Sequence, residues 1–258
     1  MFFRNNHWKQ SDQIEITQIP LRLRGLGSAF HGYRLVQFSD LHMDFWMTPE
    51  HLLEIVELVN QQGPDLVAIT GDFVGRNPAR HAQSLVTCLR QLKSVDGVVA
   101  VLGNHDHWKD PQTVRHILKE SQIDELNNRV RTIQRGENQL HIAGIDDHAS
   151  QLSHLGEVVE LLPASGIAIL LAHTPDFADL SAPTGRFALQ ISGHSHGGQI
   201  NLPLIGSPYL PRFARKYVAG LYQVGEMLLY TNRGVGRVHL PFRLGSRPEI
   251  TVFTLIGD

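Results

Sequence analysis

Apolar residues occur along the chain in short runs separated by polar segments. Four runs are apolar at almost every position, as is typical of strands buried on both faces: residues 33–39, 66–70, 98–102 and 167–172. Between the first three runs, apolar residues recur at helical spacing. A first helix is expected from the N-cap Thr48 and Pro49 to a stop signal at Gly63-Pro64. Further helices are predicted at residues 81–95 and 111–121. This alternation predicts parallel strands joined by right-handed crossovers.

The second half of the chain has short strands, turn signals and little helix. Residues 151–162 are the main helical exception, and the predicted strands are residues 140–145, 189–192, 220–224, 227–231 and 250–255. These strands predict a second sheet, either mixed or antiparallel. Two sheets packed face to face, with helices outside, give an α/β fold of four layers, an α/β/β/α sandwich. No repeat or linker divides the 258 residues, so one domain over residues 1–258 is expected.

Composition is that of an ordinary globular protein and disfavours several other classes. The net charge of −2 offers no general attraction to nucleic acid, so no stable nucleic-acid partner is expected. Cys88 is the single cysteine and is expected to be a small buried apolar residue. No apolar stretch approaches the length of a membrane span, and the first residues show no export signal. A cytoplasmic protein is therefore expected.

Side chains that bind metals follow five of the apolar runs. The segments are Asp40-Leu41-His42, Gly71-Asp72, Gly103-Asn104-His105-Asp106, Ala172-His173 and Gly193-His194-Ser195-His196. The carboxyl ends of parallel strands meet at one edge of a sheet, so these side chains are expected to lie together. Carboxylate, amide and imidazole ligands suit two adjacent transition-metal ions, a device for hydrolysing phosphate esters. The ligand set does not select among manganese, zinc, iron and nickel.

The five segments, in this order, resemble the motifs of the calcineurin-like metallophosphoesterases. The resemblance covers the chain from about residue 14 to residue 255. Residues 217–222, 233–236 and 247–250 are similar to segments of the small bacterial phosphodiesterases of the YkuE/YaeI type. The resemblance implies the metallo-dependent phosphatase fold. It also implies a branch that includes pyrophosphohydrolases acting on UDP-diacylglucosamine in lipid A synthesis.

The resemblance also implies a role for each residue of the motifs. The implied ligands are Asp40, His42, Asp72 and His196 for one ion, and Asp72, Asn104, His173 and His194 for the other. Asp72 would bridge the two ions with its two oxygens, together with the hydroxide that attacks phosphorus. His105 would stay off the metals and protonate the leaving oxygen. Asp106 would hold His105 in orientation.

Two arginine- or proline-rich features have more than one interpretation. Arg233, Arg237 and Arg243 could bind phosphate or could pair locally within the last turns. Residues 202–217 combine prolines with large apolar side chains. A loop of this kind could cover the active site, touch a membrane near a lipid substrate, or pack across the second sheet, and the packed loop is slightly favoured. Trp108 is expected to pack within its loop.

The predicted function is that of a dinuclear metal-dependent phosphoesterase. Its substrate would be a small molecule with a phosphodiester or pyrophosphate bond. A narrower alternative is a UDP-diacylglucosamine pyrophosphohydrolase, which would act on a lipid-linked substrate and touch the inner membrane peripherally. An alternative of another class is a non-catalytic binding module on the same fold. The complete ligand set disfavours that module.

Overall fold

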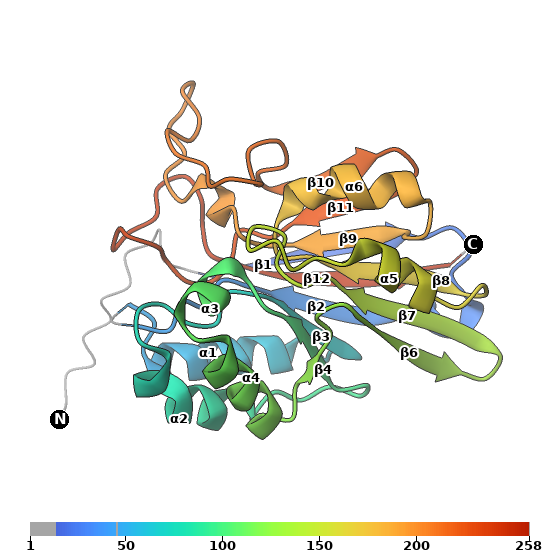
Figure 1. The fold of residues 1–258 in the computed structure, drawn as a ribbon, viewed down its shortest axis with the longest axis horizontal. Coiled ribbons are helices and arrows are strands. Elements are labelled where there is room, and N and C mark those ends of the chain that lie inside the picture. Colours follow the sequence, from blue (N-terminus) through green and yellow to red (C-terminus); the bar gives the residue numbers. More distant parts are fainter. Residues whose placement is uncertain (1–13, 45, 258) are drawn as a thin grey trace.

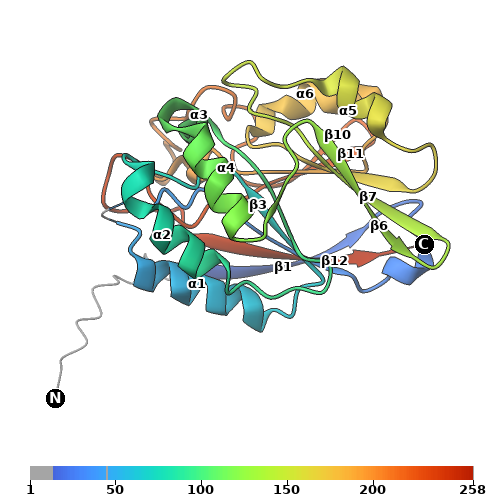
Figure 2. The same ribbon diagram turned by 60° about the horizontal axis from the view of Figure 1, so that its bottom comes forward.

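The computed structural model describes residues 14–44 and 46–257. The first residues of the chain, for which no export signal is expected, lie outside this part. Two six-stranded sheets pack against each other, with helices on both outer sides (Figures 1 and 2). Their strand orders are β1-β12-β2-β3-β4-β5 and β10-β11-β9-β8-β7-β6. The predicted four-layer α/β/β/α sandwich is therefore confirmed.

The first sheet contains the parallel strands that the sequence predicted, and three further strands. Its strands are β1 (Glu15–Arg22), β2 (Arg34–Phe38), β3 (Leu66–Thr70), β4 (Val98–Val101), β5 (Asp124–Glu125) and β12 (Glu249–Ile256). β2, β3 and β4 pair in parallel register, while β12 runs antiparallel to β2. The assignment of residues 250–255 to the second sheet was thus wrong. An apolar run indicates burial but does not say which sheet buries it.

The second sheet is mixed, as predicted. Its strands are β6 (Arg129–Arg135), β7 (Asn138–Gly144), β8 (Ile167–Leu171), β9 (Leu189–Ser192), β10 (Gly220–Val224) and β11 (Met227–Thr231). Parallel pairs join β7, β8, β9 and β11, and antiparallel pairs form both edges. The edge strand β6 was missed because three arginines and a glutamine interrupt its apolar pattern.

Helices cover the outer faces of both sheets. They are α1 (Pro49–Gln61), α2 (Pro78–Leu89), α3 (Asn104–Lys109), α4 (Pro111–Glu120), α5 (Leu155–Leu161) and α6 (Ala178–Ser181), with 3₁₀ turns η2 (Ser28–Phe30), η3 (Pro175–Phe177), η4 (Ala182–Thr184) and η5 (His196–Gly198). α2 begins earlier than predicted because the side chain of Asn77 caps it, accepting the N–H of Arg80. Among the described residues, no helix has both the length and the apolar character to cross a membrane.

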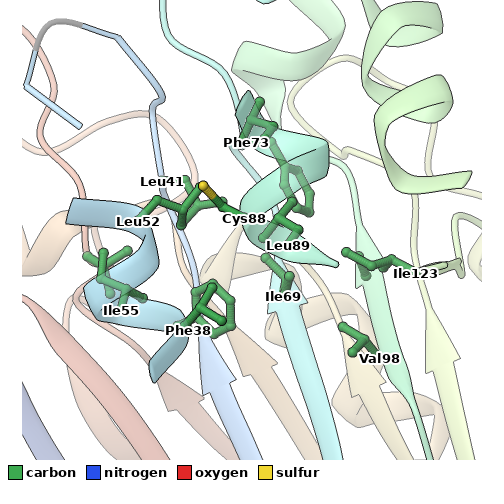
Figure 3. Close-up of a cluster of buried hydrophobic side chains, with 14 of the residues drawn as sticks. Phe38, Leu41, Leu52, Ile55, Ile69, Phe73, Cys88, Leu89, Val98 and Ile123 are labelled. Atoms are coloured by element: carbon green, nitrogen blue, oxygen red, sulfur yellow. The ribbon is translucent and has the colours of Figure 1, made fainter. Parts of the chain in front are cut away.

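Three apolar clusters hold the layers together. The first cluster lies between the first sheet and its helices. In it, Leu52 and Ile55 of α1 and Leu89 of α2 pack toward Phe38 and Ile69 of the strands (Figure 3). Cys88 lies in this cluster and is 1% exposed, as predicted. A second cluster fills the space between the sheets, and a third lies beneath α5 and α6. Each fully buried leucine or phenylalanine contributes about 1.5–3 kcal/mol. The strand ends therefore rest on a rigid support.

Candidate metal centre

The motif residues of both sheets meet at one edge of the sandwich. Asp40, Asp72 and Asn104 follow the ends of β2, β3 and β4, and His173 and His194 follow β8 and β9. All seven expected ligands are buried, with at most 7% of the residue exposed. The backbone N–H of Asp40 donates to Gly71 at 2.9 Å, and the N–H of His194 donates to the Asp40 carboxylate at 3.0 Å. The first hydrogen bond joins neighbouring strand ends of the first sheet, and the second joins the two sheets at the site.

The backbone is strained at this edge. Of the twelve non-glycine residues with positive φ in the described part of the chain, five are expected ligands: Asp40, His42, Asp72, His194 and His196. A non-glycine residue in this region costs on the order of 1–3 kcal/mol and persists only where the surroundings impose it. Such strain gathers at functional sites, and here it turns the side chains toward a common point.

One cluster of potential ligands centres on His42. Its Nε2 lies 3.1 Å from His196 Nε2 and 3.4 Å from Asp72 Oδ2. His196 Nε2 lies 3.4 Å from Asp40 Oδ1. Imidazole nitrogens and carboxylate oxygens this close present lone pairs to one another, an arrangement that a cation stabilises. The donor set therefore fits a transition-metal ion.

A second cluster centres on His173. Its Nε2 lies 3.1 Å from Asn104 Oδ1, 3.3 Å from Asp72 Oδ2 and 3.1 Å from His194 Nδ1. The distal nitrogens of both rings face backbone carbonyls, with His173 Nδ1 2.7 Å from Thr70 O and His194 Nε2 2.9 Å from Arg212 O. An N–H donated to each carbonyl leaves the lone pair of the other nitrogen pointing into the cluster. This set also fits a transition-metal ion.

Asp72 belongs to both clusters through one oxygen. Its Oδ2 faces the two groups, whereas Oδ1 accepts the backbone N–H of His105 at 2.9 Å. The expectation that both oxygens bridge therefore differs from the structure, in which Oδ2 alone is common to the clusters. Gly103 is required beside it, since a Cβ at this position would collide with Asp72 Oδ1.

Burial sets the protonation state of the imidazoles. It lowers the pKa of His42 to about 3 and that of His194 to about 4, so both rings are neutral at pH 7. Burial also disfavours charge on His173, but the neighbouring Asp72 carboxylate outweighs it and raises the pKa of His173 to about 10. A metal ion must therefore displace a proton from His173, and the other rings are already in the ligand form.

Asp106 has contacts that differ from those expected. Its oxygens accept four backbone N–H groups at 2.9–3.2 Å, from Asp72, Phe73, Val74 and Gly103. Within the described residues, no hydrogen bond joins Asp106 to the ring of His105. Asp106 therefore holds the turns after β3 and β4, and with them the position of Asp72, rather than orienting His105.

His105 lies at the border between the metal centre and open space. Its ring centroid is 4.6 Å from that of His42, in an edge contact, and 5.2 Å from that of Trp108. Donor atoms of His105, His42 and Asp72 lie within 4.8 Å of one another. Burial lowers the pKa of His105. The ring is thus placed to meet a group bound at the metal centre.

The metal centre forms the floor of a cavity of about 820 Å³. We call another part of its lining the wall. The wall consists of Trp108 and residues 198–200, 208–209, 211–212 and 238–240, and most of its side chains are apolar. The amide of Gln199 is used within the wall, donating to Val238 O at 2.9 Å and accepting the N–H of the same residue at 2.8 Å. The wall therefore offers a ligand mainly apolar contacts.

The wall was only partly foreseen. Trp108 lines the cavity, against the expectation that it packs within its loop. The stretch 202–217 has two parts. Four of its residues line the cavity, namely Pro208, Tyr209, Pro211 and Arg212, while Leu204 and Ile205 are fully or largely exposed. The segment that follows η5, orange in Figure 1, projects away from both sheets. The signal in the sequence for a loop over the active site was the proline-rich, apolar composition of residues 202–217.

All three late arginines have local structural partners, in agreement with the second interpretation; Arg237 donates to Pro241 O at 2.7 Å. Arg233 pairs with Glu249 at 2.9 Å and Glu15 at 3.0 Å. Arg243 is buried and donates to backbone carbonyls. The contacts of Arg233 and Arg243 direct neither guanidinium at the cavity.

Residues 33–198, which include all seven expected ligands, match the family model described as calcineurin-like phosphoesterase. The chain belongs to this family. It is 35% identical to "Uncharacterized metallophosphoesterase YkuE" of Bacillus subtilis (strain 168), over 94% of this chain and 85% of that protein. It is 30% identical to "Phosphodiesterase YaeI" of Escherichia coli (strain K12), over 87% and 82%. These relatives confirm the predicted branch, and the chain is a metal-dependent phosphoesterase.

A solved structure supports the fold alone. The sulfate thiohydrolase SoxB of Thermus thermophilus superimposes with a TM-score of 0.55 at 15% identity, covering 88% of this chain and 57% of that one. At this identity the likeness extends to the arrangement of the sheets and says nothing of the substrate.

Proposed function

We propose that this metallophosphoesterase binds two divalent transition-metal ions and hydrolyses a phosphodiester or pyrophosphate bond. The observation that supports this most strongly is the position of Asp72 Oδ2. This atom lies 3.4 Å from His42 Nε2 and 3.3 Å from His173 Nε2, so it is within ligand distance of both clusters. A carboxylate shared by two sites is the feature that distinguishes a dinuclear centre from two separate ions.

We propose a site for each ion. The first site consists of Asp40, His42, Asp72 and His196, and the second of Asp72, Asn104, His173 and His194. Nitrogen and oxygen ligands without cysteine suit manganese, zinc, iron or nickel. Two such ions, when bound, would supply a hydroxide nucleophile at neutral pH and neutralise charge on the phosphate oxygens.

The remaining residues act around the reacting phosphate. His105, at the border of the cavity, donates a hydrogen bond to the phosphate and a proton to the leaving oxygen. Asp106 keeps Asp72 in place through the turn after β3. The apolar wall holds the organic part of the substrate and excludes water from the floor.

A substrate panel tests this function. The protein would be freed of metal, then given manganese, zinc or nickel and assayed on a phosphomonoester, a phosphodiester and a pyrophosphate diester. We expect turnover of the diester or pyrophosphate with at least one metal, and its loss in Asp72→Asn. Asp124→Asn, half exposed on β5, is the matched control and should remain active. No turnover with any metal would favour the non-catalytic binding module instead.

The wall supports a narrower second candidate, a lipid-linked pyrophosphate such as UDP-diacylglucosamine. Leu204, Ile205 and Tyr209 expose 70% or more of their surface beside a cavity whose wall is apolar. The same stretch contains the exposed basic residues Arg212, Arg215 and Lys216. Exposed apolar side chains next to basic ones are typical of peripheral contact with a membrane. An acyl chain could then pass from the bilayer along the wall while the pyrophosphate meets the floor.

Vesicle sedimentation and a paired assay test this candidate. We expect the protein to sediment with anionic vesicles and to cleave UDP-diacylglucosamine in them faster than a soluble diester. The double variant Leu204→Ser/Ile205→Ser should lose both properties and keep the soluble activity. Val95→Ser is a matched control, because Val95 and Ile205 are both 75% exposed. Absence of sedimentation in the unaltered protein would contradict a lipid-linked substrate.

A further inference from the structure

Arg243 is a buried cation without an ion pair among the described residues. It is 2% exposed, and burial lowers its pKa to about 9, which leaves it charged at neutral pH. Its N–H groups donate to four backbone carbonyls, at 2.6 Å to Gly236, 2.7 Å to Arg233, 3.2 Å to Gly234 and 3.2 Å to His196. Burying a charge costs several kcal/mol, so its retention calls for a reason beyond packing.

The guanidinium also lies directly behind one expected metal ligand. Its Nη2 is 3.1 Å from Nδ1 of His196, while Nε2 of the same ring faces His42 and Asp40. Arg243 therefore contacts both the backbone and the ring of His196. Because a guanidinium only donates, a neutral ring that accepted at Nδ1 would carry its proton on Nε2, the atom that faces the metal. The contact that holds His196 in its ligand form is therefore the donation to its backbone carbonyl.

The same arginine fixes the support of a second ligand. The turn 234–236, whose carbonyls it binds, donates two backbone hydrogen bonds to the strand end of β2: Val235 N to Ser39 O at 2.9 Å, and Gly236 N to Asp40 O at 2.8 Å. Gly234, at φ 69°, passes so close that a Cβ there would lie 2.7 Å from the Cβ of Asp40. Displacing this turn would displace Asp40.

The second site is supported differently. His173 and His194 face the carbonyls of Thr70 and Arg212, and within the described residues neither ring is hydrogen-bonded to Arg243. Both contacts of Arg243 thus fall on ligands of one site only. Asp40 and His196 belong to the first site, and neither belongs to the second.

We propose that Arg243 is the positioning residue of the first metal site, holding His196 by its backbone carbonyl and Asp40 through the turn 234–236. This inference rests on the proposed two-ion centre. Groups that orient a metal ligand from behind are typically worth 10–100-fold in metal affinity. Loss of Arg243 should therefore weaken one of the two sites and spare the other.

Titration of the metal-free protein with Mn²⁺, together with thermal denaturation, tests this role. The variants are Arg243→Met, Arg243→Lys and, as a matched control from the same turn, Arg233→Met. For Arg243→Met we expect two ions, one bound about 10–100-fold more weakly and the other as in the unaltered protein. Arg243→Lys should recover only part of this loss, because an ammonium cannot reproduce the fork. Arg233→Met should keep both affinities.

The double variant Arg243→Met/His196→Ala identifies the weakened site, since both changes should weaken the same ion and leave the affinity for the other ion unchanged. An equal loss at both sites with a lower melting temperature would mean that Arg243 acts only in folding. Unchanged binding at the first site would mean that neither the position nor the charge of Arg243 matters there, and tighter binding would mean that its charge only repels the ion. Any of these results overturns the proposal. A single ion in the unaltered protein would instead contradict the dinuclear function.

Discussion

The floor and the wall of the cavity are built in opposite ways. The floor consists of buried polar side chains at the ends of strands from both sheets, such as Asp72 and His173. The wall consists of loops with apolar side chains, among them Tyr209, which is 70% exposed. The ends of strands from both sheets position the first, and loops position the second, although positive-φ residues occur in both, among them Gln199 and His239 of the wall. The difference teaches that the expected metal ligands are positioned by the scaffold, whereas the lining that could meet the organic part of a substrate is built from loops.

The largest effect is expected from the centre of the floor. Asp72→Asn removes the negative charge that would hold both ions. It should lower kcat/KM by about 10³-fold or more, because without the ions the phosphate meets no fixed positive charge. The measurement is steady-state hydrolysis of a phosphodiester at saturating metal. If this variant kept more than a tenth of the activity, the floor would not be the catalytic part of the cavity.

His105 should affect the rate and leave the metals in place. His105→Gln is expected to lower kcat about 10²-fold, the usual worth of a general acid, with unchanged metal content. Kinetics and elemental analysis on the same sample check this. His116→Gln, an exposed histidine on α4, is the control. Metal loss in His105→Gln would make His105 a ligand, as its closeness to His42 and Asp72 also permits.

Asp106 should affect stability. In Asp106→Asn one acceptor oxygen becomes a donor, so two of the four backbone N–H groups lose their partner. Each buried unsatisfied group costs about 1–3 kcal/mol, and we expect a loss of about 2–3 kcal/mol in the free energy of unfolding. Urea denaturation measures it. A stability equal to that of the unaltered protein would show that the turns need no such support.

The wall should act on substrate binding alone. Tyr209→Ala is expected to raise KM about tenfold for a diester with a large apolar group, with kcat unchanged, since aromatic burial is lost without touching the floor. Leu161→Ala, exposed on α5, is the control. A fall in kcat with constant KM would remove the distinction between floor and wall.

The smallest effect is expected in the pH dependence of stability, and it comes from His107, near the floor. Burial disfavours charge on His107, but the carboxylate of Asp146, 2.6 Å from its Nε2, outweighs it and raises the pKa of His107. The stability from this pair is fully present below the unfolded pKa, about 6.5, and is lost as pH rises through the folded pKa. His107→Gln should therefore cost ~1 kcal/mol at pH 6 and less at pH 9. Equal costs at both pH values would contradict this.

Sequence patterns predicted the parts of the molecule that depend on local signals. Buried strands such as residues 66–70 have unbroken apolar runs, and each expected ligand follows a strand, so the structure brings all seven together. Residues 250–255 were placed in the wrong sheet because pairing partners far along the chain leave no local mark. The contacts of Asp106 were not predicted, and the wall around Tyr209 was only one of several alternatives, for the same reason, since they join loops distant in sequence.

Crystals of the protein soaked with Mn²⁺ test the central claim, a dinuclear centre that shares Asp72, most directly. Anomalous scattering would show where the ions lie. Two peaks are expected about 3.5–4 Å apart, with Oδ2 of Asp72 bound to both. A single peak at full occupancy, or two ions that do not share Asp72, would contradict the account.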